Sequence, residues 1–301
     1  LLVYAMKKTL TLIVHGHRKL SAKTLKSIEL MEGESTLFVR KKMTKGPGDA
    51  CEIACNASSK SDIIIAVGGD GTCNEVINGM MLNPNPKIVF GVIPNGTGND
   101  FIRNFPPFDP HSFVAAIVND ITRPIDLGKI DFGKNTRYFL NVADIGFGAQ
   151  VIETLNKQRR NGITGKFSYN LAIVRTFLTY RKPVLKVECE EILFEGKSLM
   201  IIFSNGTSFG SGLQIYPEAK LDNGKLGLTI IGEVSLFEYV KNLGRLKTGK
   251  KIDHPEVHYS EFKKVRVSTT NKNLLVETDG EIAGRSSLTI EVVPDALRII
   301  G

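Results

Sequence analysis

Residues 63–75 read Ile-Ile-Ile-Ala-Val-Gly-Gly-Asp-Gly-Thr-Cys-Asn-Glu, an apolar run that empties into a glycine-rich turn. A second apolar run, at 88–93, ends in the same way in the residues PNGTGND at 94–100. Short β-branched runs are typical of buried strands, and glycines after a strand let backbone N–H groups approach a phosphate closely. The two stretches therefore predict neighbouring phosphate-binding loops at one end of a parallel sheet.

The first of these turns has the composition of a phosphate cradle. Gly68, Gly69 and Gly71 remove three side chains from four residues, and the segment 72–81 is predicted to begin a helix whose N-terminal dipole favours anions. Asp70 stands where a carboxylate could reach a metal ion that bridges phosphates. Taken alone, the turn is equally compatible with a tight strand-to-helix connection capped by the aspartate. The second loop favours the functional interpretation.

The first 127 residues alternate strand-like and helix-like segments, which predicts a doubly wound parallel sheet with its ligand beyond the strand C-termini. We expect strands at 9–15, 35–39, 63–67 and 88–93, and helices at 21–31, 47–57, 72–81 and 109–119.

After Asp126 the pattern changes, because short apolar runs now follow one another with turn residues between them. This predicts an antiparallel β-sandwich. The expected runs are 138–143, 184–189, 198–204, 226–231, 263–268, 274–277 and 287–293. One helix is predicted at 165–181, and its apolar residues at helical spacing favour a core position over a membrane contact. They are Phe167, Leu171, Val174, Phe177 and Leu178.

Composition narrows the class of protein. The chain has 301 residues, 42% of them hydrophobic and 23% charged, as in an ordinary globular protein. No apolar stretch approaches the roughly 20 residues that span a bilayer. The first residues, LLVYAMKK, do not predict a signal peptide, because the lysines follow the short apolar stretch. Four scattered cysteines without a second metal-spaced pair predict reduced cytoplasmic thiols.

The net charge of +8 suits anionic partners such as phosphates or an anionic membrane surface. Basic residues are dispersed, and no nucleic-acid motif is recognisable, so we expect no nucleic-acid partner.

Six sequence blocks, in order, resemble the diacylglycerol kinase catalytic domain family, in particular its bacterial soluble lipid kinases. The blocks are GGDGTCNE (68–75), GVIPNGTGNDF (91–101), PIDLG (124–128), FLNVADIGFG (139–148), PEAKLDNGKL (217–226) and TDGE (278–281). The resemblance implies two domains of the NAD kinase and diacylglycerol kinase type, with a nucleotide cleft between them. Residues 1–127, with a returning tail at about 294–301, would form the nucleotide-binding α/β domain, and 128–293 the β-sandwich domain for the lipid.

The resemblance also implies an ATP- and Mg²⁺-dependent lipid kinase. The residues implied in nucleotide binding are Gly16, Thr44, Gly68, Gly69, Asp70, Gly71, Thr72, Asn74, Glu75 and Thr97. Asp70, Asp100 and Asp126 resemble the acidic cluster that organises the catalytic Mg²⁺, with Asp70 and Asp126 counted as catalytic. Glu281 matches the general base, which removes the proton of the lipid hydroxyl. Without the other blocks, Asp279-Gly280 before it would suggest only a hairpin turn.

Two departures from the family pattern stand out. A structural Mg²⁺ site is implied at 220–225, but the family's aspartate is replaced there by Asn223. An amide oxygen lacks charge, so weaker binding is predicted, and Asp222 could substitute; Lys220 and Lys225 would supply backbone carbonyls. The turn after the first strand is Val14-His15-Gly16-His17-Arg18-Lys19 rather than Asn-Pro.

The acceptor is expected to be a lipid alcohol, with diacylglycerol first. NAD kinase activity is the alternative within the same class, and a catalytically silent nucleotide- or lipid-binding protein is the alternative from another class. We expect a cytoplasmic protein that docks transiently on the inner membrane face. Whether the protein forms a homodimer is left open.

Overall fold

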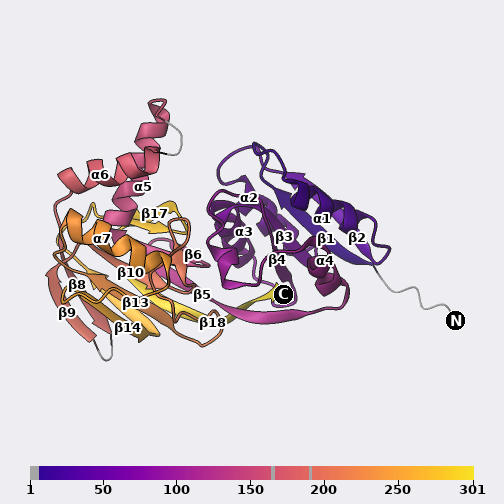
Figure 1. Cartoon of the computed structure of the whole chain (residues 1–301). Helices are drawn as coiled ribbons and strands as arrows, with labels where there is room; N and C mark the ends of the chain where they lie inside the picture. Colours follow the sequence, from indigo (N-terminus) through magenta and orange to yellow (C-terminus); the bar gives the residue numbers. More distant parts are fainter. Residues whose placement is uncertain (1–6, 164–166, 190–191) are drawn as a thin grey trace. The chain divides into compact units, whose positions relative to one another are not determined.

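The computed structural model of the chain describes residues 7–163, 167–189 and 192–301 (Figure 1). They divide into two compact units, unit 1 with residues 1–127 and 294–301 and unit 2 with residues 128–293. Two long strands, β5 (Thr122–Asp131) and β18 (Leu288–Ile300), contribute residues to both units. The start of the chain, at 1–6, lies outside the described residues, so the interpretation of that segment stays a prediction.

Unit 1 is an α/β domain whose central sheet is parallel. Its strand order is β2 (Leu37–Met43), β1 (Lys8–Val14), β3 (Ile63–Gly68), β4 (Val89–Pro94) and the end of β18. The end of β18 pairs in parallel with β4, where Arg298 lies opposite Val89. The C-terminal residues therefore return to the first unit, as the family resemblance implies.

Two helix pairs cover the two faces of this sheet (Figure 1). Helices α1 (Ala22–Glu32) and α4 (Pro110–Val118) contact each other, and so do α2 (Asp49–Ala57) and α3 (Asp70–Leu82). A short 3-10 helix, η1, covers Phe101–Asn104. Every residue of β3 is buried, because both faces of the strand are covered, as is usual in parallel sheets. The predicted doubly wound α/β architecture is confirmed.

Unit 2 contains an antiparallel sandwich. One sheet has the order β14 (Val257–Phe262), β13 (Leu226–Ile231), β10 (Met200–Ser204), β7 (Val142–Gly146), β16 (Leu275–Thr278) and β17 (Glu281–Arg285). The other is built from β9 (Ile192–Lys197), β8 (Val184–Cys189), β15 (Lys264–Ser268), the first part of β18, β5 and β6 (Thr136–Phe139). A separate ribbon joins β11 (Ser208–Phe209) to β12 (Leu213–Gln214).

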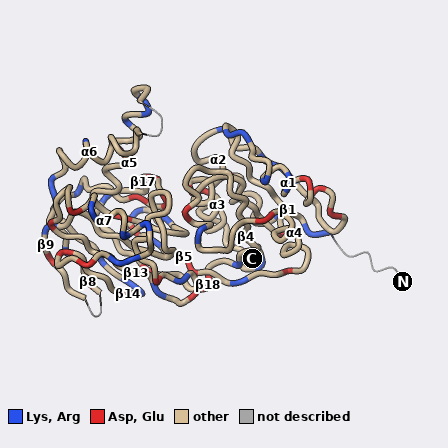
Figure 2. Tube along the Cα trace, in the orientation of Figure 1, with Lys and Arg blue, Asp and Glu red and all other residues tan. Residues whose placement is uncertain are grey.

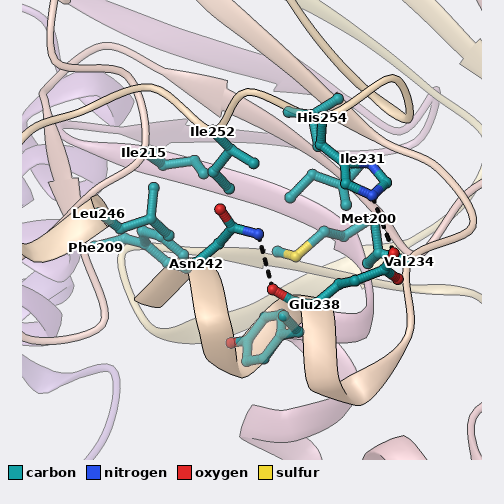
Figure 3. Close-up of a pocket in the computed structure, with 12 residues that line it drawn as sticks. Met200, Phe209, Ile215, Ile231, Val234, Glu238, Asn242, Leu246, Ile252 and His254 are labelled. Carbon is teal, nitrogen blue, oxygen red and sulfur yellow. Dashed lines mark hydrogen bonds and ion pairs between the residues drawn. The ribbon is translucent and has the colours of Figure 1, made fainter. Parts of the chain in front are cut away.

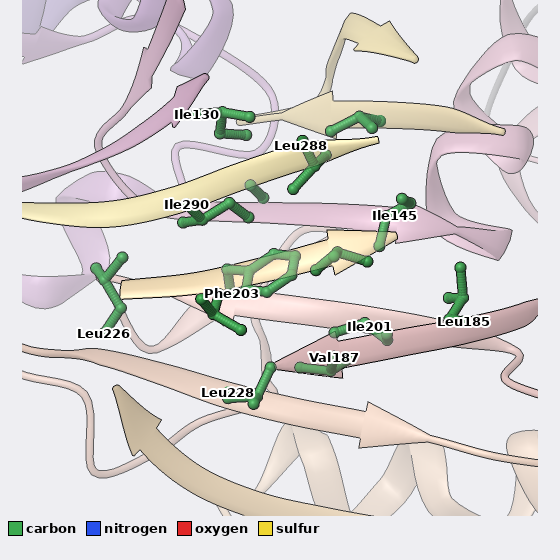
Figure 4. Packing of buried hydrophobic residues seen from close by; sticks show 14 of the residues in the cluster. Ile130, Ile145, Leu185, Val187, Ile201, Phe203, Leu226, Leu228, Leu288 and Ile290 are labelled. Carbon is green, nitrogen blue, oxygen red and sulfur yellow. The ribbon is translucent and has the colours of Figure 1, made fainter. Parts of the chain in front are cut away.

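The sandwich core lies between these two sheets (Figure 4). Ile201 and Phe203 of β10 point into it, whereas Met200 and Ile202 point to the other side of the same strand, into a second apolar cluster. That second cluster is covered by α5 (Phe147–Arg160), α6 (Ser168–Thr179) and α7 (Leu236–Lys247). Because side chains alternate along a strand, helices on the outer face explain why β10 is buried throughout.

Helix α6 lies within the predicted range, but the assignment of its apolar stripe to the core is wrong. Leu178 is 77% exposed and Phe167, just before the helix, is 82% exposed, and Leu171 and Val174 are exposed as well. Of the five stripe residues, only Phe177 packs on the inner cluster, to which Tyr169 and Ile173 of the same helix also contribute. The buried face of α6 instead carries the small residues Ser168, Ala172 and Thr176, and Thr176 donates a hydrogen bond to Thr154 of α5 at 2.9 Å.

Two helices were not predicted. Helix α7 has a capping box, in which the Ser235 hydroxyl accepts from the Glu238 N–H and the Glu238 carboxylate accepts from the Ser235 N–H. This pattern of Ser and Glu three residues apart is readable in the sequence. Helix α5 begins after Gly146, at φ +118°, with no side-chain cap. Its start therefore carries no comparable signal.

Candidate functional site

In unit 1, the loops that follow β1, β2, β3 and β4 all lie at the carboxyl edge of the parallel sheet, because these four strands are neighbours and run in the same direction. This edge is where open α/β sheets bind ligands. The predicted nucleotide-binding residues come from these four loops and from the start of α3. They are Gly16 after β1, Thr44 after β2, residues 68–75 at the end of β3 and the start of α3, and Thr97 after β4.

The loop after β3 turns directly into a helix. Helix α3 begins at Asp70, two residues before the predicted start, and Gly69 is its N-cap without any side-chain hydrogen bond. The helix therefore presents backbone N–H groups and the positive end of its dipole at the strand end. A Cβ on Gly68 would lie 2.4 Å from the Thr72 hydroxyl oxygen, so glycine is needed for this turn.

The loop after β4 packs against the first one. A Cβ on Gly96 would lie 2.4 Å from the Gly69 Cα atom, and the Asn95 N–H donates to the Gly68 carbonyl at 2.7 Å. The Asp70 carboxylate accepts the Phe101 N–H at 3.0 Å, which ties the start of α3 to the far end of the second loop. The two predicted loops are thus held together by close packing and hydrogen bonds.

The loops after β1 and β2 join the same edge. The Gly16 N–H donates to the Thr44 hydroxyl at 3.1 Å, and a Cβ on Gly16 would lie 2.0 Å from the Thr44 carbonyl oxygen. The Arg18 guanidinium donates to the Thr97 hydroxyl at 3.1 Å. The structure therefore brings Gly16, Thr44 and Thr97 to the edge where Gly68 and Gly69 lie, and it adds a cation, Arg18, to the set.

Two of the predicted nucleotide contacts have other partners. The Glu75 carboxylate accepts the N–H groups of Gly48 and Ala50, at 2.9 and 3.1 Å, and so caps the start of α2. Asn74 is fully buried and accepts from the Asn78 amide at 3.2 Å. Both side chains hold helices in place, so direct contact of these side chains with a nucleotide is not supported.

The three predicted acidic ligands of the catalytic metal do not form a joint ligand shell. Asp100 forms an ion pair with Arg103 at 3.3 Å, and Asp126 is fully buried and accepts the Asp295 N–H at 2.9 Å. Within the described ranges, no group of three or more His, Cys, Asp or Glu side chains is arranged to hold a metal ion. Asp70 lies at the start of α3 and Asp100 ends the second glycine-rich loop, whereas Asp126 lies on β5.

The loop at 220–225, where a structural Mg²⁺ site is predicted, forms a local turn. The Asn223 side-chain oxygen accepts the N–H of Lys225 at 3.1 Å, and the Lys225 ammonium pairs with Glu261 at 3.1 Å. The Asn223 amide oxygen, predicted to take the place of the family's aspartate, therefore closes a local turn. Asp222 is exposed, and among the residues described it belongs to no group of three or more His, Cys, Asp or Glu side chains that could hold a metal ion.

The predicted base lies in unit 2, at the start of β17. Glu281 is half-buried and follows the turn between β16 and β17, in which Asp279 and Gly280 have φ of +50° and +91°. Two positive φ values are those of a tight hairpin turn. The Asp279 carboxylate accepts the N–H groups of Leu140, Asn141 and Val142 at 2.9, 2.9 and 3.1 Å. The hairpin interpretation is correct, and the aspartate anchors the turn to the start of β7.

Unit 2 also holds an apolar cavity of about 30 Å³ beneath α7 (Figure 3). Sequence reasoning missed it, because its wall comes from strands and a helix far apart in the chain. Apolar residues line it, among them Met200, Ile231 and Leu246. At its rim the His254 ring lies 3.2 Å from the Glu238 carboxylate, and hydrogen bonds from Ser235 and then His254 lower the pKa of Glu238 to about 2.

No helix in the part of the chain that the structure describes is long and apolar enough to cross a membrane.

Comparison with solved structures identifies the class of fold. Over 98% of this chain and 96% of the other, the fold matches the crystal structure of a diacylglycerol kinase from Bacillus anthracis, with a TM-score of 0.69 and 20% identity. It also matches an NAD kinase from Archaeoglobus fulgidus solved with ATP, with a TM-score of 0.53 and 10% identity over 97% of this chain and 93% of the other. The fold is that shared by these two kinds of kinase.

Sequence comparison gives the family. Residues 9–130 match the diacylglycerol kinase catalytic domain, and residues 141–301 match the YegS C-terminal NAD kinase beta sandwich-like domain. A diacylglycerol kinase of Staphylococcus haemolyticus is 35% identical over 80% of this chain and 72% of its own length, and one of Staphylococcus saprophyticus is 34% identical over 80% and 78%. The chain belongs to the diacylglycerol kinase family. The resemblance stated from the sequence blocks is confirmed.

Proposed function

We propose that this protein transfers the γ-phosphoryl group of ATP to the hydroxyl of a membrane lipid, with diacylglycerol as the first candidate acceptor. The observation that carries the proposal is the contact between Gly69 and Gly96, because it joins two glycine-rich loops into one surface around the N-terminal N–H groups of α3. Such a surface suits a polyphosphate, which needs several donors at close range. Membership in the diacylglycerol kinase family supports a lipid as the acceptor.

In unit 1, the loops would hold the triphosphate. The start of α3 would supply N–H donors and its dipole, and Arg18, already bonded to Thr97, would add positive charge. Mg²⁺ suits Asp70, because this ion is usually bound through one or two carboxylates together with substrate phosphates. When bound, the ion would neutralise charge on the transferring phosphoryl group. Asp126, whose carboxylate accepts the Asp295 N–H, would help to hold β5 and β18 together.

In unit 2, Glu281 would act as the general base. Its carboxylate would take the proton of the lipid hydroxyl while the lipid oxygen forms a bond to the γ-phosphorus. The bond from that phosphorus to the β–γ bridging oxygen breaks, and ADP leaves with the electron pair. The turn before Glu281 is fixed by the three hydrogen bonds of Asp279. Such a rigid turn suits a base that must lie within hydrogen-bond reach of its proton.

The lipid chains would use apolar surface of unit 2. The cavity beneath α7 has a volume close to that of one water, so an acyl chain would have to displace α7 to enter it. We expect this displacement to begin at the exposed Phe237 and Val240 of that helix, 76% and 53% exposed.

The exposed apolar face of α6 is proposed as the surface that docks on an anionic membrane. Leu171, Val174 and Leu178 of the helix, with Phe167 just before it, lie outside the packed core. The preceding helix, α5, ends with the exposed basic residues Lys157, Arg159 and Arg160. Figure 2 shows in blue where Lys and Arg lie along the chain. Apolar side chains beside basic ones fit an interfacial helix that binds anionic lipid. The protein would then be peripheral to the cytoplasmic membrane face.

The direct test is an incubation of the purified protein with γ-labelled ATP and three acceptors, assayed separately: diacylglycerol in anionic vesicles, a total lipid extract, and NAD. We expect label in a lipid product that is separated by thin-layer chromatography. Label in NADP alone would replace the proposal with NAD kinase activity. ATP binding without transfer to any acceptor would favour a catalytically silent binding protein.

A further inference from the structure

Two carboxyl groups that the proposed reaction does not use are buried side by side in unit 2. Asp144 on β7 and Glu277 on β16 lie directly opposite each other in the antiparallel ladder. Asp144 is 1% exposed and Glu277 is 5% exposed, and their carboxyl groups are hydrogen-bonded to each other. An ionised carboxylate can only accept, so a hydrogen bond between two carboxyl groups needs a proton on one of them.

The remaining hydrogen bonds of the pair indicate which group carries the charge. The Asp144 carboxylate also accepts the Ala149 N–H, at 3.0 Å, in the first turn of α5. The positive end of a helix dipole favours negative charge there. A Cβ on Gly148 would lie 2.0 Å from Asp144 Oδ2, so glycine at this position makes room for the carboxylate. The charge therefore belongs on Asp144 and the proton on Glu277.

Glu277 also holds the turn that leads to the proposed base. Its Oε2 accepts the Gly280 N–H at 2.7 Å, one residue before Glu281. A continuous chain of hydrogen bonds thus runs from the start of α5, through Asp144 and Glu277, to Gly280. The Asp279 carboxylate holds the same turn from the start of β7. The turn is fixed at two consecutive residues by two different carboxyl groups.

The surrounding titratable groups agree with a single negative charge on the pair. Burial raises the pKa of Asp144 to about 6, and burial together with the charge of Asp144 raises the pKa of Glu277 well above its usual value. Asp279 adds to this effect on Glu277. Tyr180 and Tyr239 act on the pair from the helical side, and burial and the charge of Asp144 raise the pKa of both. None of these three neighbours is a cation, so they do not favour a second charge.

We propose that Asp144 and Glu277 share one proton at neutral pH, and that Glu277 is a positioning residue for Glu281. The positioning role rests on the proposed function, because it matters only if Glu281 is the base. The shared proton does not rest on the proposed function. A protonated Glu277 both donates to Asp144 and accepts from Gly280, which an ionised one could not do.

The kinetic test uses three variants. Glu277→Gln retains a donor and an acceptor, Glu277→Met has similar volume but neither, and Leu228→Ala opens a cavity in the same sheet on β13, away from the turn. We expect the Met variant to lose about ten- to a hundredfold in kcat with an unchanged KM for ATP. The Gln variant should recover to within about threefold of wild type. Leu228→Ala should lower Tm but leave kcat within about twofold. Equal kcat losses in the Gln and Met variants, or a kcat that simply follows Tm across all three, would overturn the positioning role.

The shared proton has a test that needs no catalysis. A folded-state pKa above the unfolded one gives stability that is present at low pH and lost as pH rises. Wild type should lose this stability as pH rises above about 4.5, whereas the Glu277→Gln variant has no such carboxyl group to ionise. The Tm of the Gln variant minus that of wild type should therefore increase by at least about 2 °C between pH 5 and pH 8. A Tm difference that is flat with pH would overturn the shared proton. If wild type phosphorylates no lipid, the proposed function and the positioning role fail together, while this readout still decides the pair.

Discussion

Gly69 and Gly96 approach each other so closely that a single added methyl group on Gly96 would lie 2.4 Å from the Gly69 Cα atom. These two glycines belong to different loops, after β3 and after β4, and the strands that carry them are adjacent and parallel. The contact explains why both loops need glycine at the point where they meet. It also makes the two loops a single surface, the one proposed to bind phosphate, rather than two separate turns.

Gly96→Ala should therefore damage ATP binding strongly. The neighbouring atom is backbone and cannot rotate away, so the loops must separate, and overpacking of this kind costs about 1–3 kcal/mol. We expect the dissociation constant for ATP, measured by calorimetry, to rise at least about tenfold. Gly46→Ala is the matched control, because its Cβ would meet nothing within 4 Å. Unchanged ATP affinity in Gly96→Ala would argue against the joint surface.

Mg²⁺ should not stabilise the nucleotide-free protein through the loop at 220–225. The Asn223 amide oxygen carries no charge and accepts the Lys225 N–H, so we expect this loop to bind Mg²⁺ too weakly to affect stability. Addition of millimolar Mg²⁺, or its removal with EDTA, is expected to shift Tm by less than about 1 °C in the absence of ATP. A rise of several degrees would mean that a metal binds the folded state and that the loop rearranges around it. Phosphoryl transfer should still require Mg²⁺.

The start of α7 should loosen in acid. The folded-state pKa of Glu238, about 2, lies below its ordinary 4.5, so its contribution is present above pH 4.5 and is lost as pH falls toward 2. Hydrogen exchange at the Ser235 amide, which donates to this carboxylate at 2.7 Å, should accelerate over that range. In Glu238→Gln the same amide should show no such acid step. An identical pH profile in both proteins would rule out the carboxylate as the cause.

Replacement of the exposed apolar side chains of α6 should weaken membrane binding while ATP binding is retained. Leu178→Ser removes a side chain that is 77% exposed, so the fold should tolerate it. We expect at least about a threefold weaker partition onto anionic vesicles in a sedimentation assay, from the loss of apolar burial. Leu193→Ser on β9, 75% exposed, is a control for exposed leucines elsewhere in unit 2. Equal weakening by both substitutions would contradict a specific role for α6.

Much of the fold was predictable, because its signals are local. The strand predicted at 63–67 and the helix predicted at 72–81 follow from an apolar run and its glycines, and the structure extends them to Ile63–Gly68 and Asp70–Leu82. The missed helix α7 had a readable signal in Ser235 and Glu238. The exposed stripe of α6 was misassigned, because periodicity shows that a face is apolar but not that the small face of Ser168 and Ala172 is the one that packs.

The sequence could predict which loops form the site, but not which atoms each side chain contacts. The sequence blocks pointed to Gly68 and Thr97, which the structure brings to one sheet edge. They could not show that Glu75 caps another helix or that the Asn223 oxygen closes its own turn, because these are contacts of particular atoms. Asp144 and Glu277 are 133 residues apart (277 minus 144) and meet only through strand pairing, which no local pattern reveals.

The most direct test of the account is Glu281→Gln, assayed for ATP binding and for transfer of label to diacylglycerol in anionic vesicles. The amide keeps the shape of the side chain and removes its ability to take a proton. We expect the dissociation constant for ATP to stay within about twofold and lipid phosphorylation to fall by about 10²–10⁴. Turnover equal to that of wild type would contradict the assignment of Glu281 as the base and, with it, the proposed mechanism.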